Sequence, residues 1–211
     1  MNRITTTFQK LSSTHRKALV GYLTAGDPNP ETSFEILRAA CHAGLDILEL
    51  GVPFSDPTAD GPVIQVASQR ALQAGMTLTK TLELAARLRA ESDIPIMLFG
   101  YYNPLFKYGL ERLAKAAQDA GIDGLLVVDL PPEEAGPLRA ALQGTDIQIV
   151  LLVAPTTRPD RVKKIAAETG GFLYLITKAG TTGEGGLDYE TIRKHAAEVK
   201  AVSPLPVCLG F

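Results

Sequence analysis

Three carboxylates lie close together in the stretch LELGVPFSDPTADGP, residues 48–62: Glu49, Asp56 and Asp60. Glu49 ends a hydrophobic run and stands between two leucines, so we expect it to be buried. Burial disfavours the charged form of a carboxyl group and raises its pKa, which lets a glutamate both give and take a proton near neutral pH. The pattern therefore predicts an acid/base role for Glu49.

The two aspartates have a simpler explanation when each is taken alone. Asp60 precedes an expected helix start at Pro62, and an aspartate in such a turn often hydrogen-bonds to its own backbone. Asp56 stands in Ser-Asp-Pro, which favours a tight turn. Together with Glu49 they could bind a metal ion. No histidine is near and two of the acids lie in turns, so the sequence disfavours a metal site.

Seven short apolar runs alternate with longer amphipathic segments along the chain. Their length and their Val/Ile/Leu content are typical of parallel strands that are buried on both faces. Helical patterns separate most of these runs, and an additional one, ITTTFQKLSS, precedes the first. The predicted strands span residues 18–26, 45–51, 94–102, 123–130, 147–155, 171–177 and 205–210.

Repeated strand–helix units can form a closed barrel or an open, doubly wound sheet. The first loop, TAGDPNP, lacks the G-x-G-x-x-G pattern of dinucleotide-binding sheets, and polar residues follow several different strands, as in a barrel. We therefore predict an α/β fold, a (β/α)8 TIM barrel with an extra N-terminal helix, as one domain over residues 1–211. Glu49 shares one strand face with Ile47 and Gly51, and the two neighbouring leucines share the other.

Composition excludes several classes of partner. Lys and Arg number 21 and Asp and Glu number 23, which gives a net charge of -2, and there is no basic block to bind nucleic acid or an anionic membrane.

The two cysteines, Cys41 and Cys208, are too few for a disulfide framework. The N-terminus lacks the apolar segment of a signal peptide, and no apolar run reaches the roughly 18 residues of a membrane span. We expect a cytoplasmic protein.

The motif around the acids, LELGVPFSDPTADGPVIQ, closely resembles the signature of the tryptophan synthase alpha subunit family. The resemblance runs in order from about the first strand to residue 211. It includes the segments GYLTAGDP (21–28), GYYNPLFKYG (100–109), VVDLPPEEA (127–135), LLVAPTT (151–157) and LYLIT (173–177). The resemblance implies a TIM barrel that cleaves indole-3-glycerol phosphate to indole and glyceraldehyde 3-phosphate. It also implies an alpha2beta2 assembly, in which the beta subunit carries pyridoxal phosphate and the alpha subunit has no cofactor.

Carried over by position, the resemblance makes Glu49 the catalytic acid/base and Asp60 the second catalytic carboxylate. Breaking the carbon–carbon bond requires indole to leave, which protonation of ring carbon C3 permits. Glu49 would protonate C3 and then remove the hydroxyl proton of the glycerol chain. Asp60, kept ionised, would accept the ring N–H and stabilise the positive charge that develops near the nitrogen. The pKa values of the two acids should therefore differ.

The resemblance also implies a set of substrate-binding residues. Those near strand ends would border the indole pocket or approach Glu49, although an aromatic core residue is the simpler explanation for each tyrosine. The segment TKAGTTGEGG (177–186) resembles the loop that closes over substrate in this family, although its start departs from the commoner S-R-x-G-V-T-G form. The implied substrate-binding residues are Tyr22, Tyr102, Tyr174, Thr182, Gly183 and Gly210.

A surface for the beta subunit is implied by resemblance alone, because prolines and acids are common on any surface. The residues are Asp56, Asp129, Pro131 and Pro132, in the loops after the second and fourth strands.

The sequence contains no segment that resembles the eighth strand or the phosphate-binding loops of the family. The seventh predicted strand runs into Phe211, so we expect a barrel truncated after strand seven here, and a complete protein that continues further. Two alternatives to the lyase stay open. One is a catalytically weak partner-binding module that lacks the phosphate site. The other is a related phosphate barrel, such as indole-glycerol-phosphate synthase or phosphoribosylanthranilate isomerase, against which the PFSDPTADG motif argues.

Overall fold

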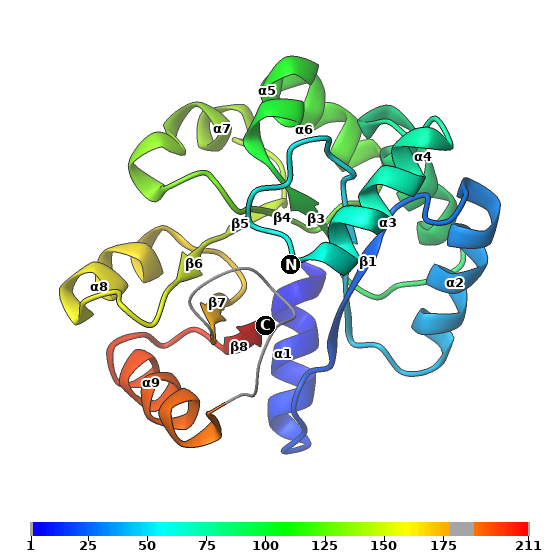
Figure 1. Ribbon diagram of the computed structural model, residues 1–211. Coiled ribbons are helices and arrows are strands. Elements are labelled where there is room, and N and C mark those ends of the chain that lie inside the picture. The colour runs from blue at the N-terminus through cyan, green and yellow to red at the C-terminus, as the bar shows by residue number, and fades with distance from the viewer. Residues whose placement is uncertain (1, 178–187, 211) are drawn as a thin grey trace.

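The computed structural model describes residues 2–177 and 188–210 (Figure 1). Strands and helices alternate along the chain, as the hydrophobic pattern predicts. The strands are β1 (Val20–Thr24), β2 (Ile47–Gly51), β3 (Ile96–Gly100), β4 (Gly124–Val127), β5 (Gln148–Val150), β6 (Leu152–Val153), β7 (Leu173–Ile176) and β8 (Val207–Gly210). The helices are α1 (Arg3–Ser13), α2 (Pro30–His42), α3 (Pro62–Gln73), α4 (Leu78–Arg89), α5 (Tyr102–Tyr108), α6 (Leu110–Asp119), the short 3₁₀ helix η1 (Pro132–Glu134), α7 (Gly136–Ala141), α8 (Pro159–Glu168) and α9 (Tyr189–Val202).

All strand pairs of the described residues are parallel and follow chain order. β1 to β5 form one sheet and β6 to β8 form a second. β5 and β6 together make up the predicted strand 147–155, which is interrupted at Leu151 because its first half pairs with β4 and its second half with β7. All seven predicted strands are therefore present. Within the described part of the chain, β1 pairs only with β2, and β8 only with β7.

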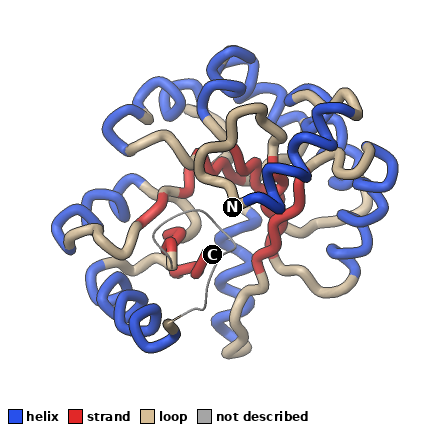
Figure 2. Tube along the Cα trace, viewed as in Figure 1, coloured by secondary structure: helices blue, strands red, loops and turns tan. Residues whose placement is uncertain are grey.

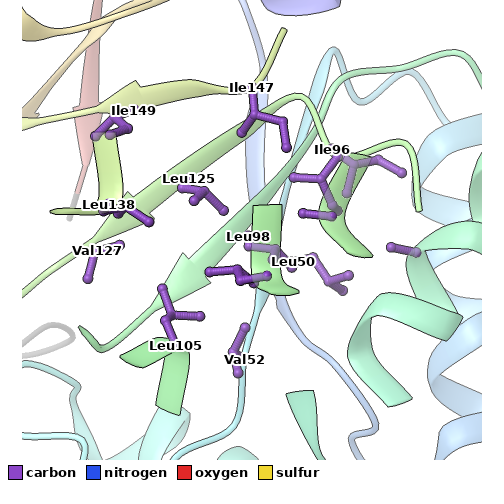
Figure 3. Close-up of a cluster of buried hydrophobic side chains, with 14 of the residues drawn as sticks. Leu50, Val52, Ile96, Leu98, Leu105, Leu125, Val127, Leu138, Ile147 and Ile149 are labelled. Atoms are coloured by element: carbon purple, nitrogen blue, oxygen red, sulfur yellow. The ribbon is translucent and has the colours of Figure 1, made fainter. Parts of the chain in front are cut away.

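The strands surround an interior, and helices α2 to α9 lie outside them, whereas α1 lies across one end of the interior (Figure 1 and Figure 2). Side chains alternate along each strand, so one set points inward and the other packs beneath the helices. Figure 3 shows the outer set, in which Leu50, Leu98 and Leu125 from successive strands lie next to one another. The inner cluster consists of Ile4, Ile47, Met97, Leu126, Val150 and Phe172, all of them fully buried. The predicted face of Ile47 and Glu49 is thus the interior face.

The predicted N-terminal helix, α1, packs against the amino-terminal ends of the strands. Asn2 caps it by accepting the Ile4 N–H at 2.8 Å, and the Asn2 amide donates to the carbonyls of Asp123 and Asp146 at 2.8 and 2.6 Å. Ile4 is fully buried in the inner cluster, and Phe8 contacts Phe172 with ring centroids 5.5 Å apart. Apolar contacts and a buried polar cap hold α1 in this position.

Several predicted strands are too long at their carboxyl ends: the strand 18–26 ends at Thr24, and the strand 123–130 ends at Val127. The predicted strand 94–102 also overruns, because β3 ends at Gly100 and Tyr102 is the first residue of α5. Pro104 lies in the first turn of that helix, where a missing N–H costs no hydrogen bond. The apolar run GYY therefore continues from a strand into a helix start, and periodicity alone does not distinguish the two.

Candidate active site

Glu49 lies in the barrel interior near the carboxyl end of β2, opposite Tyr22 on β1 and Met97 on β3. Its side chain is only 4% exposed, and Oε1 has no hydrogen-bond partner among the described residues. Burial raises the pKa of Glu49 from 4.5 to about 7, and no neighbouring charge opposes this. A carboxyl group with this pKa exchanges a proton readily near neutral pH, as the sequence predicts.

Tyr22 interacts electrostatically with both acids. Desolvation is the largest cause that raises the pKa of its hydroxyl, and the charges of Asp60 and Glu49 both add to it. The phenol therefore stays protonated. Gly51 makes room for this ring, because a Cβ at position 51 would lie 2.2 Å from the Tyr22 hydroxyl oxygen. The space that a side chain at Gly51 would fill is thus occupied by the Tyr22 ring.

A second tyrosine approaches Glu49 from the opposite side. Tyr174 on β7 has its pKa raised first by burial and then by the charge of Glu49. Gly210 accommodates it, since a Cβ at position 210 would lie 1.9 Å from the Tyr174 ring. Phe99 on β3 contacts both Tyr22 and Tyr174 edge-on, with ring centroids 5.2 and 6.1 Å apart. Three aromatic rings therefore surround the carboxylate.

Cys208 on β8 belongs to the same interior face. It lies opposite Tyr174 in the strand register. Burial and the charge of Glu49 raise the pKa of its thiol to about 12, so the thiol stays protonated. Thr24, at the end of β1, is also buried, and its side chain lies close enough to the Tyr22 hydroxyl to lower the pKa of that hydroxyl, against the larger effect of burial.

Asp60 is half-buried and lies directly before Gly61, the N-cap of α3. Burial raises the pKa of its carboxyl group above the ordinary value, and a hydrogen bond with the Tyr101 hydroxyl opposes this rise. That hydroxyl also accepts the backbone N–H of Ala59 at 2.9 Å. Tyr101 is 4% exposed, and burial is the main cause that raises its own pKa to about 12. Asp60 is therefore held by a tyrosine, whereas Glu49 has no hydrogen-bond donor beside it within the described part of the chain.

Tyr101, rather than Tyr102, is the residue that the structure brings to Asp60. The Tyr102 ring packs on Phe106 of α5 with centroids 5.7 Å apart, and its backbone N–H donates to Asp129 at 2.7 Å. The substrate-binding role predicted for Tyr102 stays a prediction. The sequence pattern does not single out Tyr101, because periodicity does not show that the strand before it ends at Gly100.

The residues predicted to meet a partner lie in loops at the carboxyl ends of the strands. Asp56 is exposed, and its Oδ2 accepts a hydrogen bond from the Ser55 hydroxyl, with an oxygen–oxygen distance of 2.5 Å. Asp129 is exposed, and Pro131 and Pro132 are half-buried where η1 begins. The predicted residues Thr182 and Gly183 lie outside the described residues.

Within residues 2–177 and 188–210, no three His, Cys, Asp or Glu side chains come together in a group that could hold a metal ion. In the same ranges, no helix has the length and the apolar composition that crossing a membrane requires.

Comparison with known proteins shows the family to which the chain belongs. The family model described as "Tryptophan synthase alpha chain" matches residues 8–211. The chain belongs to the tryptophan synthase alpha chain family. It is 53% identical over 211 residues to the tryptophan synthase alpha chain of Desulfatibacillum aliphaticivorans and 54% identical to that of Desulfosudis oleivorans. Each alignment covers all of this chain and 80% of the relative.

Solved structures of the family confirm the predicted fold class. Tryptophan synthase subunit alpha from Legionella pneumophila is 37% identical, with a TM-score of 0.91 over 100% of this chain and 78% of that one. A Mycobacterium tuberculosis tryptophan synthase structure is 33% identical, with a TM-score of 0.90 over 100% of this chain and 80% of that one. This tryptophan synthase alpha chain is a lyase by family and acts as an alpha subunit in tryptophan biosynthesis. It spans about four fifths of the length of these relatives.

Proposed function

We propose that this alpha chain cleaves indole-3-glycerol phosphate to indole and glyceraldehyde 3-phosphate, with Glu49 as the acid/base and Asp60 as the second carboxylate. The observation that carries the proposal is the contrast between the two acids. Glu49 is buried with no polar partner among the described residues and has a pKa of about 7, whereas Asp60 is half-buried and hydrogen-bonded by Tyr101. Desolvation acts unopposed on Glu49 and is opposed by a hydrogen bond at Asp60, a difference that suits a reaction with one proton carrier and one carboxylate that stabilises charge.

The proposed step begins with Glu49 protonated. Its proton goes to ring carbon C3, and the positive charge that forms near the ring nitrogen is stabilised by ionised Asp60, which accepts the ring N–H. The bond between C3 and the glycerol chain then breaks, and its electron pair restores the aromatic indole ring. Glu49 takes the proton of the hydroxyl group on the departing carbon, which becomes the aldehyde of glyceraldehyde 3-phosphate. Glu49 thus ends the cycle in the form in which it began.

Aromatic side chains supply the remainder of the proposed pocket. Tyr22 and Tyr174, with Phe99 between them, would hold the flat indole ring next to Glu49, since aromatic rings pack well against one another. Gly210 would contribute by leaving room for Tyr174. The proposed set of substrate-binding residues further includes Tyr102, Thr182 and Gly183.

We further propose that the chain assembles with a tryptophan synthase beta subunit, in an alpha2beta2 complex. The beta subunit would carry pyridoxal phosphate and use the indole, while the alpha chain uses no cofactor. The proposed contact surface consists of Asp56, Asp129, Pro131 and Pro132, which lie in loops at the same end of the barrel as the two acids. Indole that leaves this end of the barrel would enter the partner directly.

Indole release from indole-3-glycerol phosphate tests the proposed reaction. The Glu49→Gln variant keeps the shape of the side chain and removes its acid/base function, so its rate should fall to the background level. Glu133→Gln, an exposed glutamate on η1, is the matched control and should retain the rate of the unmodified chain. Substantial activity in Glu49→Gln would refute the acid/base role.

A further inference from the structure

An ion pair with bidentate geometry joins helix α3 to the loop after β1, near the active site. Arg70 of α3 donates from Nε to Asp27 Oδ1 at 2.6 Å and from Nη2 to Asp27 Oδ2 at 2.8 Å. Asp27 lies in the loop between β1 and α2, three positions after Thr24. Exposed ion pairs usually contribute little, but a two-pronged arginine–carboxylate pair also imposes a geometry on the two segments that it joins.

The same two segments are also packed together by a buried contact. Gly26, next to Asp27, has a φ of +84°, and a Cβ there would lie 2.7 Å from the Met76 side chain. Met76 follows α3 and is only 3% exposed. The Gly26 N–H donates to the buried Ser33 hydroxyl of α2 at 2.9 Å. The carboxyl end of α3 therefore rests on a loop that is itself held in place.

The other end of α3 holds the backbone of Asp60. The Gln65 side-chain amide donates to the Asp60 carbonyl at 2.8 Å, and the Gln65 backbone N–H bonds to the Gly61 carbonyl at 3.0 Å. Gln65 and Arg70 belong to one continuous helix, Pro62–Gln73. A shift of α3 at Arg70 is therefore transmitted to the peptide that carries the Asp60 carboxylate.

We propose that Asp27 and Arg70 are positioning residues, which set the orientation of Asp60 through α3. This inference rests on the proposed function, because it concerns the same carboxylate. A displacement of about 1 Å at a reacting group can lower a rate by about a hundredfold. Arg70 is remote from the chemistry and its loss permits only a partial shift, so Arg70→Gln should lower kcat about tenfold. KM should change less than about twofold, since the pocket walls on β3 and β7 are unaffected.

The experiment compares this pair with a second pair of the same kind. Arg161 of α8 binds Glu133 of η1 through two hydrogen bonds of 2.8 and 3.1 Å, and its side chain is as exposed as that of Arg70. Arg161→Gln is therefore the matched control and should leave kcat within about twofold. Arg70→Lys keeps the charge without the two-pronged geometry and should restore part of the rate. Asp27→Asn should resemble Arg70→Gln, and the double variant should be no slower than either single one.

A second readout does not depend on turnover. Because the hydrogen bond from Tyr101 lowers the pKa of Asp60, displacement of Asp60 should raise that pKa, as followed by carbon-13 NMR of the labelled carboxyl group. The rise should occur in Arg70→Gln and not in Arg161→Gln. Equal rates and equal Asp60 pKa values in these two variants would overturn the inference. Absence of indole release from the unmodified chain would instead overturn the proposed function, while the NMR comparison would still decide the role of Arg70.

Discussion

Replacing Glu49 with glutamine should stabilise the folded chain at alkaline pH while it abolishes activity. In the folded state burial raises the pKa of Glu49 from 4.5 to about 7, whereas the unfolded chain keeps the ordinary value. Between these two values the folded state binds the proton more tightly, so stability decreases as pH rises through this window. The difference corresponds, at about 1.4 kcal/mol per pH unit, to about 3 kcal/mol at pH 8.

Glutamine has nearly the same shape and carries no charge, so the variant avoids this penalty. The free energy of unfolding of Glu49→Gln relative to the unmodified chain should therefore rise by about 3 kcal/mol at pH 8, and by less than about 1 kcal/mol at pH 5. Urea unfolding followed by circular dichroism, at pH 5, 6, 7 and 8, measures this difference directly. The measurement requires no substrate.

Glu133→Gln is an informative control because the pKa of Glu133 moves in the opposite direction. A hydrogen bond from Arg161 lowers the pKa of this exposed carboxyl group, so its contribution to stability is present above the ordinary pKa and lost as pH falls. Glu133→Gln should therefore gain no stability at pH 8. A Glu49→Gln stability difference that is the same at pH 5 and pH 8 would refute the reasoning, since it would mean that burial does not perturb Glu49.

Three further predictions concern the surroundings of the acids. Asp60→Asn should lower kcat by about a hundredfold or more and leave KM within a few fold, because its charge is needed in the transition state; an equal change in both, in steady-state kinetics, would indicate a binding role. Tyr101→Phe removes the hydroxyl that lowers the pKa of Asp60, so that pKa should rise and the acid limb of the pH–rate profile should shift to higher pH. An acid limb at the same pH as in the unmodified chain would contradict this. Gly51→Ala should destabilise the chain by about 1–3 kcal/mol in urea unfolding, because its Cβ would lie 2.2 Å from the Tyr22 hydroxyl, while Gly136→Ala, with no atom within 4 Å, should be nearly neutral.

Much of the fold follows from the periodicity of the sequence. Strands of a parallel sheet bury both of their faces, so apolar runs of six to nine residues, separated by helical patterns, predict a parallel α/β fold with few alternatives. The same periodicity places Glu49 on the face of Ile47, and the structure confirms that this face is the barrel interior. A buried carboxylate was therefore predictable from three residues.

Boundaries and pairwise packing were not predictable in the same way. The residues Tyr101 and Tyr102 look alike in the sequence, and only the end of β3 at Gly100 decides which of them points toward Asp60. The interruption of the predicted strand at Leu151 depends on pairing with two different neighbours, which are distant in sequence. Likewise, a glycine in a strand does not show which neighbouring side chain occupies the space that its missing side chain leaves.

The contrast between the two acids has its origin in where each is attached. Glu49 belongs to a strand, whose parallel register sets Tyr22 and Met97 opposite it and leaves Oε1 without a partner among the described residues, so desolvation alone raises its pKa. Asp60 belongs to a loop, which turns back far enough for Tyr101 to support its carboxylate and for water to reach it. Desolvation and hydrogen bonding then oppose each other at Asp60. A barrel strand followed by a long loop therefore supplies two carboxylates of different surroundings from one chain segment, one suited to carry a proton and one to stabilise a charge.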